Sequence, residues 1–545
     1  NPRAMIAATL RWVDVNILAL GRELRLSYLP PLMVYLAYGI SGLTSIVGTF
    51  FVKEYLGLSA AFLAALGFWA GIPFVLKMPI GHLVDLFWRW KSWLVFVGAG
   101  LIAASLLIMV GLLTDHAAMT EVMSAEAWFV LSALLAPVGF VVQDVVADAM
   151  TVEAVPRVDE SGKPIPQETR KLMNTTMQTL GRVALIGGLA LVAAINLYMF
   201  GDVERLTEAE KIATYRRIYL TATAIPFISV AGVAFAFFLR RRDLARLVAQ
   251  GMDQAQARIL LEVPDAPPAA NWWILGGSLV FVAFTLGMGL GRTAFNQEII
   301  FAGSLAIVMF LIAKLTRELE PEARATLIGT AIVIFIYRAV PSPGEGLTWW
   351  MIDELKFDQR FLAVLDLIAG MLTLFGMFLF RRFMAVRSIA YVVGFLTIAG
   401  ALLSLPVLGL YYGLHHWTLA ATGGIVDARF IVIVNTALAS PLGQIAMIPM
   451  LAWIANSAPQ NLKATYFAIM ASFSNLALSA SQLGTKYLNE IYVVSREVKD
   501  AASGAVKMPA DYSQLGELLV VVFAIGLALP FAAIFVVRAL RLRWA

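Results

Sequence analysis

The chain has 545 residues, of which 60% are apolar and 14% charged, and its formal net charge is +5. It contains no cysteine, which excludes disulfides, thiolate zinc sites and iron–sulfur clusters, and no separate secretory signal is expected. The Lys and Arg residues lie in short loops between long apolar blocks, so the positive-inside rule explains the charge and nucleic-acid binding is not expected.

The apolar blocks are long enough to cross a bilayer, because about 20 helical residues at about 1.5 Å rise span its hydrocarbon core. The opening stretch, 1–26, is interrupted by charged residues and is predicted to be an interfacial N-terminal segment. Residues 27–240 are predicted to form an N-terminal half of six helices. The predicted spans lie near 32–51, 60–84, 93–113, 128–150, 175–200 and 218–239.

Residues 241–271 are charged and then Pro-rich, which is typical of a cytoplasmic linker. We predict a two-helix central insertion at 272–315, followed by a C-terminal half of six helices at 322–545. The predicted spans lie near 272–291, 298–315, 325–341, 359–380, 388–411, 428–455, 464–488 and 516–539. The fold class is therefore an all-α polytopic membrane protein with about fourteen transmembrane helices.

The two predicted halves resemble each other at an offset of 299 residues. The matched pairs are Leu56 with Leu355, Phe62 with Phe361, Leu63 with Leu362, and Gly71 with Gly370. These matches lie where the first helix of each half ends and the second begins, and duplicated halves are typical of secondary transporters. If both termini are cytoplasmic, the basic loops fall inside, so we predict a multi-pass protein of a bacterial inner membrane.

Several motifs carry a family resemblance. Gly81, Asp85 and Arg89 lie at and just after the end of the second span. This pattern resembles the conformational latch of the major facilitator superfamily, in which the glycine permits close helix approach. The segments PFVLKMPIGHLVD (73–85), VVQDVVADAMTVE (141–153) and APQNLKATYFAIMASFSNLALSASQLG (458–484) together resemble the folate-biopterin transporter family of that superfamily. The resemblance implies the major facilitator fold and a flat, anionic, folate- or pterin-like solute.

Polar side chains inside the predicted spans are candidate site residues, because a charge is costly inside a bilayer. Asp144 and Arg182 have similar predicted depths on the fourth and fifth spans, and an ion pair between them is one hypothesis. We predict that Asp144 carries a coupling proton and that Arg182 binds an anionic part of the solute, since a guanidinium donates two bonds to a carboxylate. The predicted hydrogen-bonding partners of the solute are Gln143, Gln178, Gln444, Asn475 and Gln482.

Asp148 and Glu153 lie one and two helical turns nearer the cytoplasm and are predicted to act in a gate or latch, together with the motif residues above. A static ion pair that fixes helix packing is the alternative for Asp144. Arg338 and Asp366 are expected nearer the outer face, where an external gate and interfacial snorkelling are equally compatible with the sequence.

Four histidines lie in loops without metal-ligand spacing, so neither a metal nor a cofactor is predicted. No Walker motif or nucleophile–base pattern is discernible, and an enzyme is not expected. The leading hypothesis is a proton-coupled symporter whose partners are a small-molecule substrate, protons and the lipid bilayer. One alternative is a non-transporting protein of this fold that assists assembly of a membrane or pigment–protein complex, with 272–315 docking a membrane-protein partner. A muropeptide permease is a further alternative.

Overall fold

The computed structural model describes most of the chain. The described residues are 2–75, 77–262, 269–290, 293–317, 319–380, 383, 387–447, 449–450, 463–500 and 503–544. Within them the regular secondary structure is helical apart from one short antiparallel hairpin, so the predicted all-α class is confirmed. Of the described helical segments, ten are long and apolar enough to span a membrane, and two shorter ones are also apolar. The count of about fourteen stays a prediction.

The first part of the chain contains the helices that form the predicted N-terminal segment and N-terminal half. They are α1 (Pro2–Val13), α2 (Ala19–Arg22), α3 (Leu29–Gly39), the 3₁₀ turn η3 (Ile40–Thr44), α4 (Ser45–Tyr55), α5 (Ala60–Val75), α6 (Lys77–Leu86), α7 (Lys91–Thr114), α8 (His116–Val122), α9 (Ala125–Ala154), α10 (Gln167–Met199), α11 (Glu208–Ala222) and α12 (Ala224–Ala249). The first transmembrane segment, α3–η3–α4, is thus an α-helix interrupted by a 3₁₀ turn.

The second part contains the linker helix, the insertion and the predicted C-terminal half. Its elements are α13 (Gln254–Glu262), α14 (Trp272–Leu290), α15 (Asn296–Thr316), α16 (Pro321–Ala339), α17 (Glu345–Asp353), α18 (Gln359–Leu379), α20 (Ile389–Tyr411), α21 (Leu414–Ala421), α22 (Ala428–Ala439), the 3₁₀ turn η6 (Ser440–Leu442), α24 (Lys463–Ile491), β1 (Val498–Lys499), β2 (Val506–Met508) and α25 (Leu515–Ala539). Part of the predicted span 428–455 lies outside the described residues.

Polar side chains mark where several helices begin. Ser124, Thr207, Asp358 and Asp427 each accept a hydrogen bond from a backbone N–H in the first turn of α9, α11, α18 and α22. At α11, Glu210 also bonds back to the cap residue and completes a capping box. The first backbone N–H groups of a helix have no partner within it, and these caps satisfy them. The caps therefore set the residue at which each helix begins.

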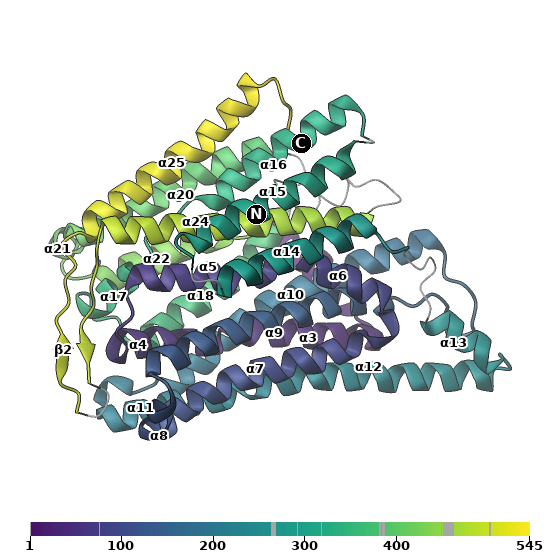
Figure 1. Ribbon diagram of the computed structural model, residues 1–545, viewed down its shortest axis with the longest axis horizontal. Helices are drawn as coiled ribbons and strands as arrows, with labels where there is room; N and C mark the ends of the chain where they lie inside the picture. Colours follow the sequence, from purple (N-terminus) through teal and green to yellow (C-terminus); the bar gives the residue numbers. More distant parts are fainter. Residues whose placement is uncertain are drawn as a thin grey trace.

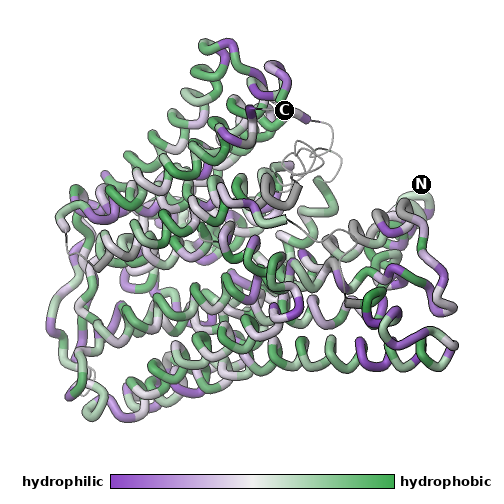
Figure 2. The backbone as a smooth tube through the Cα atoms, turned by 45° about the vertical axis from the view of Figure 1, so that its right-hand side comes forward, coloured by the Kyte–Doolittle hydropathy of each residue, from purple (hydrophilic) through white to green (hydrophobic). Residues whose placement is uncertain are grey.

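The long helices run roughly side by side, with the connecting elements gathered at two opposite ends (Figure 1). The β1–β2 hairpin lies with α8, α11, α17 and α21 at one end, which we call the hairpin end, and α13 lies at the other, the linker end. The helices are hydrophobic along most of their length, and hydrophilic stretches gather near their ends (Figure 2). The β1–β2 hairpin and the predicted cytoplasmic linker therefore lie at opposite ends.

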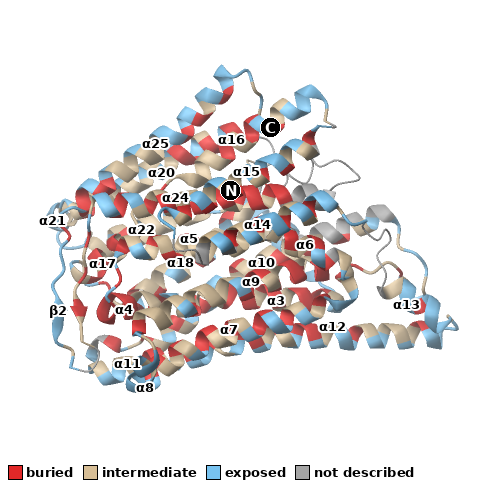
Figure 3. Cartoon of the chain, in the orientation of Figure 1, coloured by how far each residue is buried: buried red, intermediate tan, exposed pale blue. Residues whose placement is uncertain are grey.

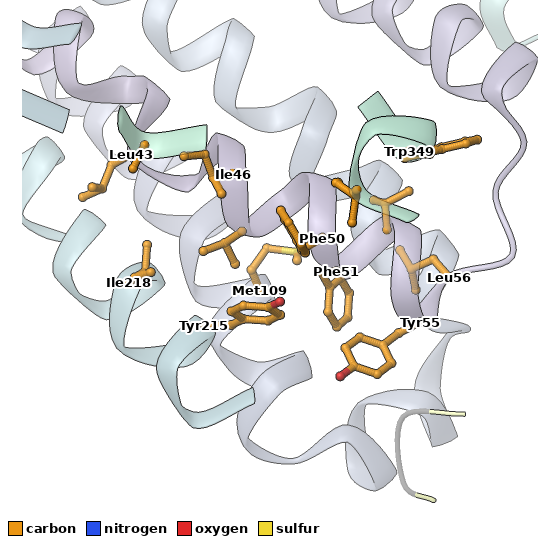
Figure 4. Close-up of a cluster of buried hydrophobic side chains, with 14 of the residues drawn as sticks. Leu43, Ile46, Phe50, Phe51, Tyr55, Leu56, Met109, Tyr215, Ile218 and Trp349 are labelled. Atoms are coloured by element: carbon orange, nitrogen blue, oxygen red, sulfur yellow. The ribbon is translucent and has the colours of Figure 1, made fainter. Parts of the chain in front are cut away.

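Buried side chains line the inner helices, while α12 and α25 show long exposed stretches (Figure 3). The largest apolar core lies at the hairpin end, where Phe50, Phe51 and Tyr55 of α4 pack with Tyr215 of α11 and Trp349 of α17 (Figure 4). This core contains residues of both predicted halves. Elsewhere, two clusters lie within the first half, and one joins the insertion to the second half. Two smaller clusters join Phe68, Ile72 and Val75 of the first half to Leu476 and Leu483 of α24.

Small residues allow one especially close helix contact. A Cβ added at Gly188 of α10 would lie 2.7 Å from backbone atoms of Gly39 of α3, so neither position accommodates a side chain without a shift. The neighbouring Gly187 and Gly42 have nothing within 4 Å of such a Cβ. The same is true of Gly81, so the close helix approach expected at that motif glycine is wrong for this structure.

The two-helix insertion lies against both predicted halves. α14 packs on α6 and α15, and α15 packs on α24. The imidazole Nε2 of His82 accepts a hydrogen bond of 3.0 Å from the backbone N–H of Asn271, just before α14, and Lys486 of α24 pairs with Glu298 of α15 at 3.3 Å. One face of each inserted helix is therefore buried. The outer faces keep exposed apolar residues such as Trp272 and Phe310.

Candidate functional site

An ionic cluster lies between α6 and α9, well inside the helical bundle. Asp144 and Asp148 are four residues apart on α9, so their side chains project from the same face of the helix. Lys77, the first residue of α6, lies between them: its Nζ is 2.8 Å from an oxygen of Asp144 and 2.8 Å from an oxygen of Asp148. The hydroxyl of Tyr35 on α3 donates to Asp148 at 2.5 Å. One ammonium group thus bridges two carboxylates.

This arrangement corrects the expected pairing of Asp144. Among the described residues, Asp144 forms its ion pair with Lys77, and no ion pair within 4 Å joins it to Arg182. Arg182 is partly buried on α10 and still contributes to the electrostatic field at Asp144. The cation closest to Asp144 comes instead from the second transmembrane segment. A lysine has a long, flexible stem, which lets it bridge carboxylates on a neighbouring helix.

Lys77 is the functional candidate that the sequence reasoning missed. It is a single cation in the apolar block 60–84, and any ionisable residue inside a span is a site candidate by default. Asp148 also changes its expected role, because it shares Lys77 with Asp144. The side chains of Lys77, Asp144 and Asp148 are 22%, 16% and 45% exposed, so the cluster is open to small polar species.

Gln143 faces away from this cluster. It is buried, and its Nε2 donates to the Val95 carbonyl at 3.2 Å and to the Ser229 hydroxyl at 3.0 Å. These bonds tie α9 to α7 and α12, which makes Gln143 a packing residue in this conformation. Its Oε1 is buried without a partner among the described atoms. The side chain of Gln178 lies outside the described residues.

The predicted amides of the second half lie at two other places. On α24, Asn475 donates to the Phe74 carbonyl at 3.1 Å, and Gln482 lies so close to α5 that a Cβ added at Gly67 would be 2.8 Å from its Oε1. Both therefore belong to the interface between α5 and α24. Gln444 follows η6, and its buried Oε1 has no partner among the described residues. The structure does not gather these amides around Asp144.

The predicted latch residues are partly tied into ion pairs at the linker end of α9. Glu153 accepts from Lys91 at 2.5 Å and from Arg240 at 3.3 Å, which links α9 to α7 and α12. Arg89 is exposed, and the side chain of Asp85 lies outside the described residues. Glu153 therefore joins helices of one predicted half, and no described ion pair of Glu153 reaches the other half.

The hairpin end is held by polar contacts between the predicted halves. Lys53 at the end of α4 forms an ion pair with Asp353 at the end of α17, and Tyr512 donates to the same carboxylate. The buried guanidinium of Arg496 donates to the carbonyls of Val52 and Leu56. Arg496 also lies 4.7 Å from the centre of the Trp349 ring, and burial lowers its pKa to about 10.

A cavity of about 560 Å³ lies next to these contacts, and Val52 and Trp349 are among the residues that line it. Its walls carry hydroxyl groups, among them Thr44, Thr49, Ser105 and Ser132, and one carboxyl group, Glu345 at the start of α17. This cavity is therefore more polar than the second cavity described below.

The sequence is similar to a known protein family and to known transporters. Residues 286–541 match the family model described as the BT1 family. This chain resembles the folate-biopterin transporters. The folate-biopterin transporter of Synechocystis sp. is 22% identical over 450 residues, which cover 82% of this chain and 71% of that protein. A putative folate transporter 2 of Plasmodium berghei is 25% identical over 171 residues, or 30% of this chain and 34% of that protein. The resemblance predicted from the sequence motifs is confirmed.

Solved structures with a similar fold are also transporters. A peptide transporter POT matches with a TM-score of 0.57 and 13% identity, covering 94% of this chain and 95% of that chain. A POT family transporter in complex with 5-aminolevulinic acid gives 0.60 and 10%, covering 94% and 96%. The nucleoside transporter NupG gives 0.53 and 11%, covering 94% and 99%. The similarity to these solved structures concerns the fold alone. The names of the family and of the sequence relatives indicate a transporter and not an enzyme, as predicted.

Proposed function

We propose that this protein is a secondary active transporter that moves a small organic anion, folate- or pterin-like, in symport with protons by alternating access. The names of the family and of the relatives support transport across a membrane and suggest the solute class. The observation that carries the coupling is the bridge from Lys77 to Asp144 and Asp148.

The charges of this site suggest how a proton and an anion are coupled. Two carboxylates, Asp144 and Asp148, face two cations, Lys77 and Arg182, so the site is neutral when all four groups are ionised. An incoming carboxylate adds one negative charge in a region where unbalanced charge is costly. Protonation of one aspartate restores neutrality and releases Lys77 from one of its two bonds. Proton and anion therefore favour each other's binding.

Arg182 supplies the second element of the proposal. In the described part of the chain no carboxylate lies within 4 Å of its guanidinium, so its donors remain for a ligand. A planar guanidinium binds a carboxylate through two parallel hydrogen bonds, a geometry that an ammonium group lacks. Lys77 then acts as the group that senses proton occupancy, and Arg182 as the group that binds the solute.

The helix starts support the two-half arrangement on which alternating access depends. α5 begins at Ala60 and α18 at Gln359, which reproduces the offset of 299 residues. The first transmembrane segment of each half is also interrupted at a matching place, by η3 between α3 and α4 and by residues 340–344 between α16 and α17. Interrupted helices near the midplane are typical of substrate and ion sites in duplicated transporters.

The distribution of contacts fits one state of such a cycle. The largest shared core and the polar bonds of Lys53 and Arg496 join the two halves at the hairpin end, whereas the clusters between α5 and α24 that also join them are smaller. This pattern supports a conformation that is closed at the hairpin end. The linker at the opposite end is predicted to be cytoplasmic, which would make the hairpin end external and open the site to the cytoplasm in this conformation.

The test compares two transport modes in one variant reconstituted into liposomes. Asp144→Asn cannot take up a proton, so we expect it to lose gradient-driven accumulation of labelled folate or pterin. It should retain exchange of labelled for unlabelled solute at equal concentrations, because exchange needs no net proton movement. Arg182→Ala should lose both modes. Accumulation by Asp144→Asn at the wild-type level would contradict the coupling role.

A further inference from the structure

A second cavity, of about 740 Å³, lies entirely within the predicted C-terminal half. All its lining residues fall between Ile334 and Pro530, on α16, α17, α20, α22, α25 and the turns around η6. In Figure 1 the helices α16, α20 and α25 lie together in the upper part of the molecule, away from α9. Its volume is within the range of small-molecule sites. It is separate from the ionic cluster, because no residue of the first half lines it.

One charged side chain lines this cavity. Arg338, in the last turn of α16, donates to the Ser474 hydroxyl on α24 and lies 3.8 Å from the sulfur of Met450. Among the described residues no Asp or Glu lines the cavity, and none forms an ion pair with Arg338. Arg338 is partly shielded from water, and its described partners are neutral. An anionic ligand would supply the missing countercharge.

The other residues of the cavity wall indicate which kind of ligand the cavity would accommodate. It is mainly aliphatic, and the aromatic rings on it are those of Tyr337 and Phe523, so it offers little stacking surface for a flat heterocycle. Asn435 also lines the cavity, and its buried Oδ1 has no hydrogen-bond partner among the described residues. A ligand with an N–H or hydroxyl group would donate to that oxygen.

We propose that this cavity binds an amphipathic organic carboxylate with an aliphatic chain and one hydrogen-bond donor. The carboxylate pairs with Arg338, the donor bonds to Asn435, and the chain fills the aliphatic part of the cavity. Two cavity-forming helices, α20 and α25, also present exposed apolar side chains such as Leu402 and Phe535, so the site lies one helix layer from the bilayer in which such molecules dissolve. This site is distinct from that of the transported solute.

The probe for this proposal is radiolabelled N-lauroylglycine, which carries a carboxylate, an amide N–H and an aliphatic chain. Its binding is measured to full-length protein in lipid nanodiscs, with empty nanodiscs as the blank. We expect saturable binding at a single site. Arg338→Gln should raise the Kd at least tenfold, while Arg324→Gln, which removes an exposed charge from the other end of α16, should leave it unchanged.

A second variant tests the cavity without altering the charge. Gly400 lines the cavity, and a Cβ added there meets nothing within 4 Å, so Gly400→Phe should fold normally and fill the space. It should abolish binding of the probe. Unlabelled folate should not displace the probe if the two sites are distinct. Absence of binding to the wild type, equal binding by Gly400→Phe, or full displacement by folate would each overturn the proposal.

Discussion

Replacing Lys77 tests the ionic cluster most sharply. In Lys77→Met the two aspartates, each 2.8 Å from the Lys77 Nζ, lose their common countercharge. Removing one partner of a fully buried ion pair costs about 3–5 kcal/mol, whereas an exposed pair contributes about 0–1 kcal/mol. The side-chain exposures of 22%, 16% and 45% place this cluster between these limits. We therefore expect the free energy of unfolding to fall by about 2 kcal/mol.

The assay is thermal unfolding in nanodiscs at pH 7, combined with a second substitution. Adding Asp148→Asn to Lys77→Met removes one of the two unbalanced charges, so the double variant should recover part of the lost stability. The control is Lys507→Met, since Lys507 is 60% exposed and pairs with Asp500 at 3.0 Å on the surface hairpin. The control should change stability by less than about 0.5 kcal/mol. If Lys77→Met is as stable as this control, or if Asp148→Asn adds a further loss, the bridging role is wrong.

Two further predictions concern other parts of the molecule. Arg496→Ala removes two charge-assisted hydrogen bonds and should loosen the hairpin end. A thiol introduced into the polar cavity by Thr49→Cys should then react at least about tenfold faster with an impermeant maleimide. Gly188→Ala should cost about 1–3 kcal/mol, measured by thermal unfolding, whereas Gly187→Ala should cost nothing.

Each of these predictions has a clear contrary result. Because the chain contains no cysteine, the maleimide reacts only with the introduced thiol. An unchanged reaction rate after Arg496→Ala would mean that Arg496 does not hold the two halves together at the hairpin end. Equal stability of the two glycine variants would contradict the close contact between α3 and α10.

The sequence predicts the helices well, because an apolar block in a bilayer satisfies its backbone only as a helix. Of the two helix interruptions described above, the sequence predicts only one. Pro341 and Pro343 mark the one after α16, since proline lacks a backbone donor. The 3₁₀ turn at Ile40–Thr44 has no proline or charge, and depends on tertiary packing such as the contact of Gly39 with α10.

The candidate site was predicted less completely than the fold. Residue depth follows from counting along a helix, so Asp144 and Arg182 were placed at comparable levels. Which side chains meet depends also on the rotation of each helix about its axis and on side-chain length, and neither follows from the depth of a residue. For this reason Lys77 was missed and Gln143 was expected to face the solute, although it bonds to α7 and α12.

Proton-coupled anion transport is tested most directly by uptake of labelled folate and of a simple pterin into proteoliposomes, with and without an inward-directed proton gradient, using Arg182→Ala as the control. We predict accumulation above equilibrium with at least one of the two solutes, only when the gradient is present and only in the wild type. Absence of uptake of both solutes, or uptake that is indifferent to the gradient, would contradict proton-coupled transport of this solute class.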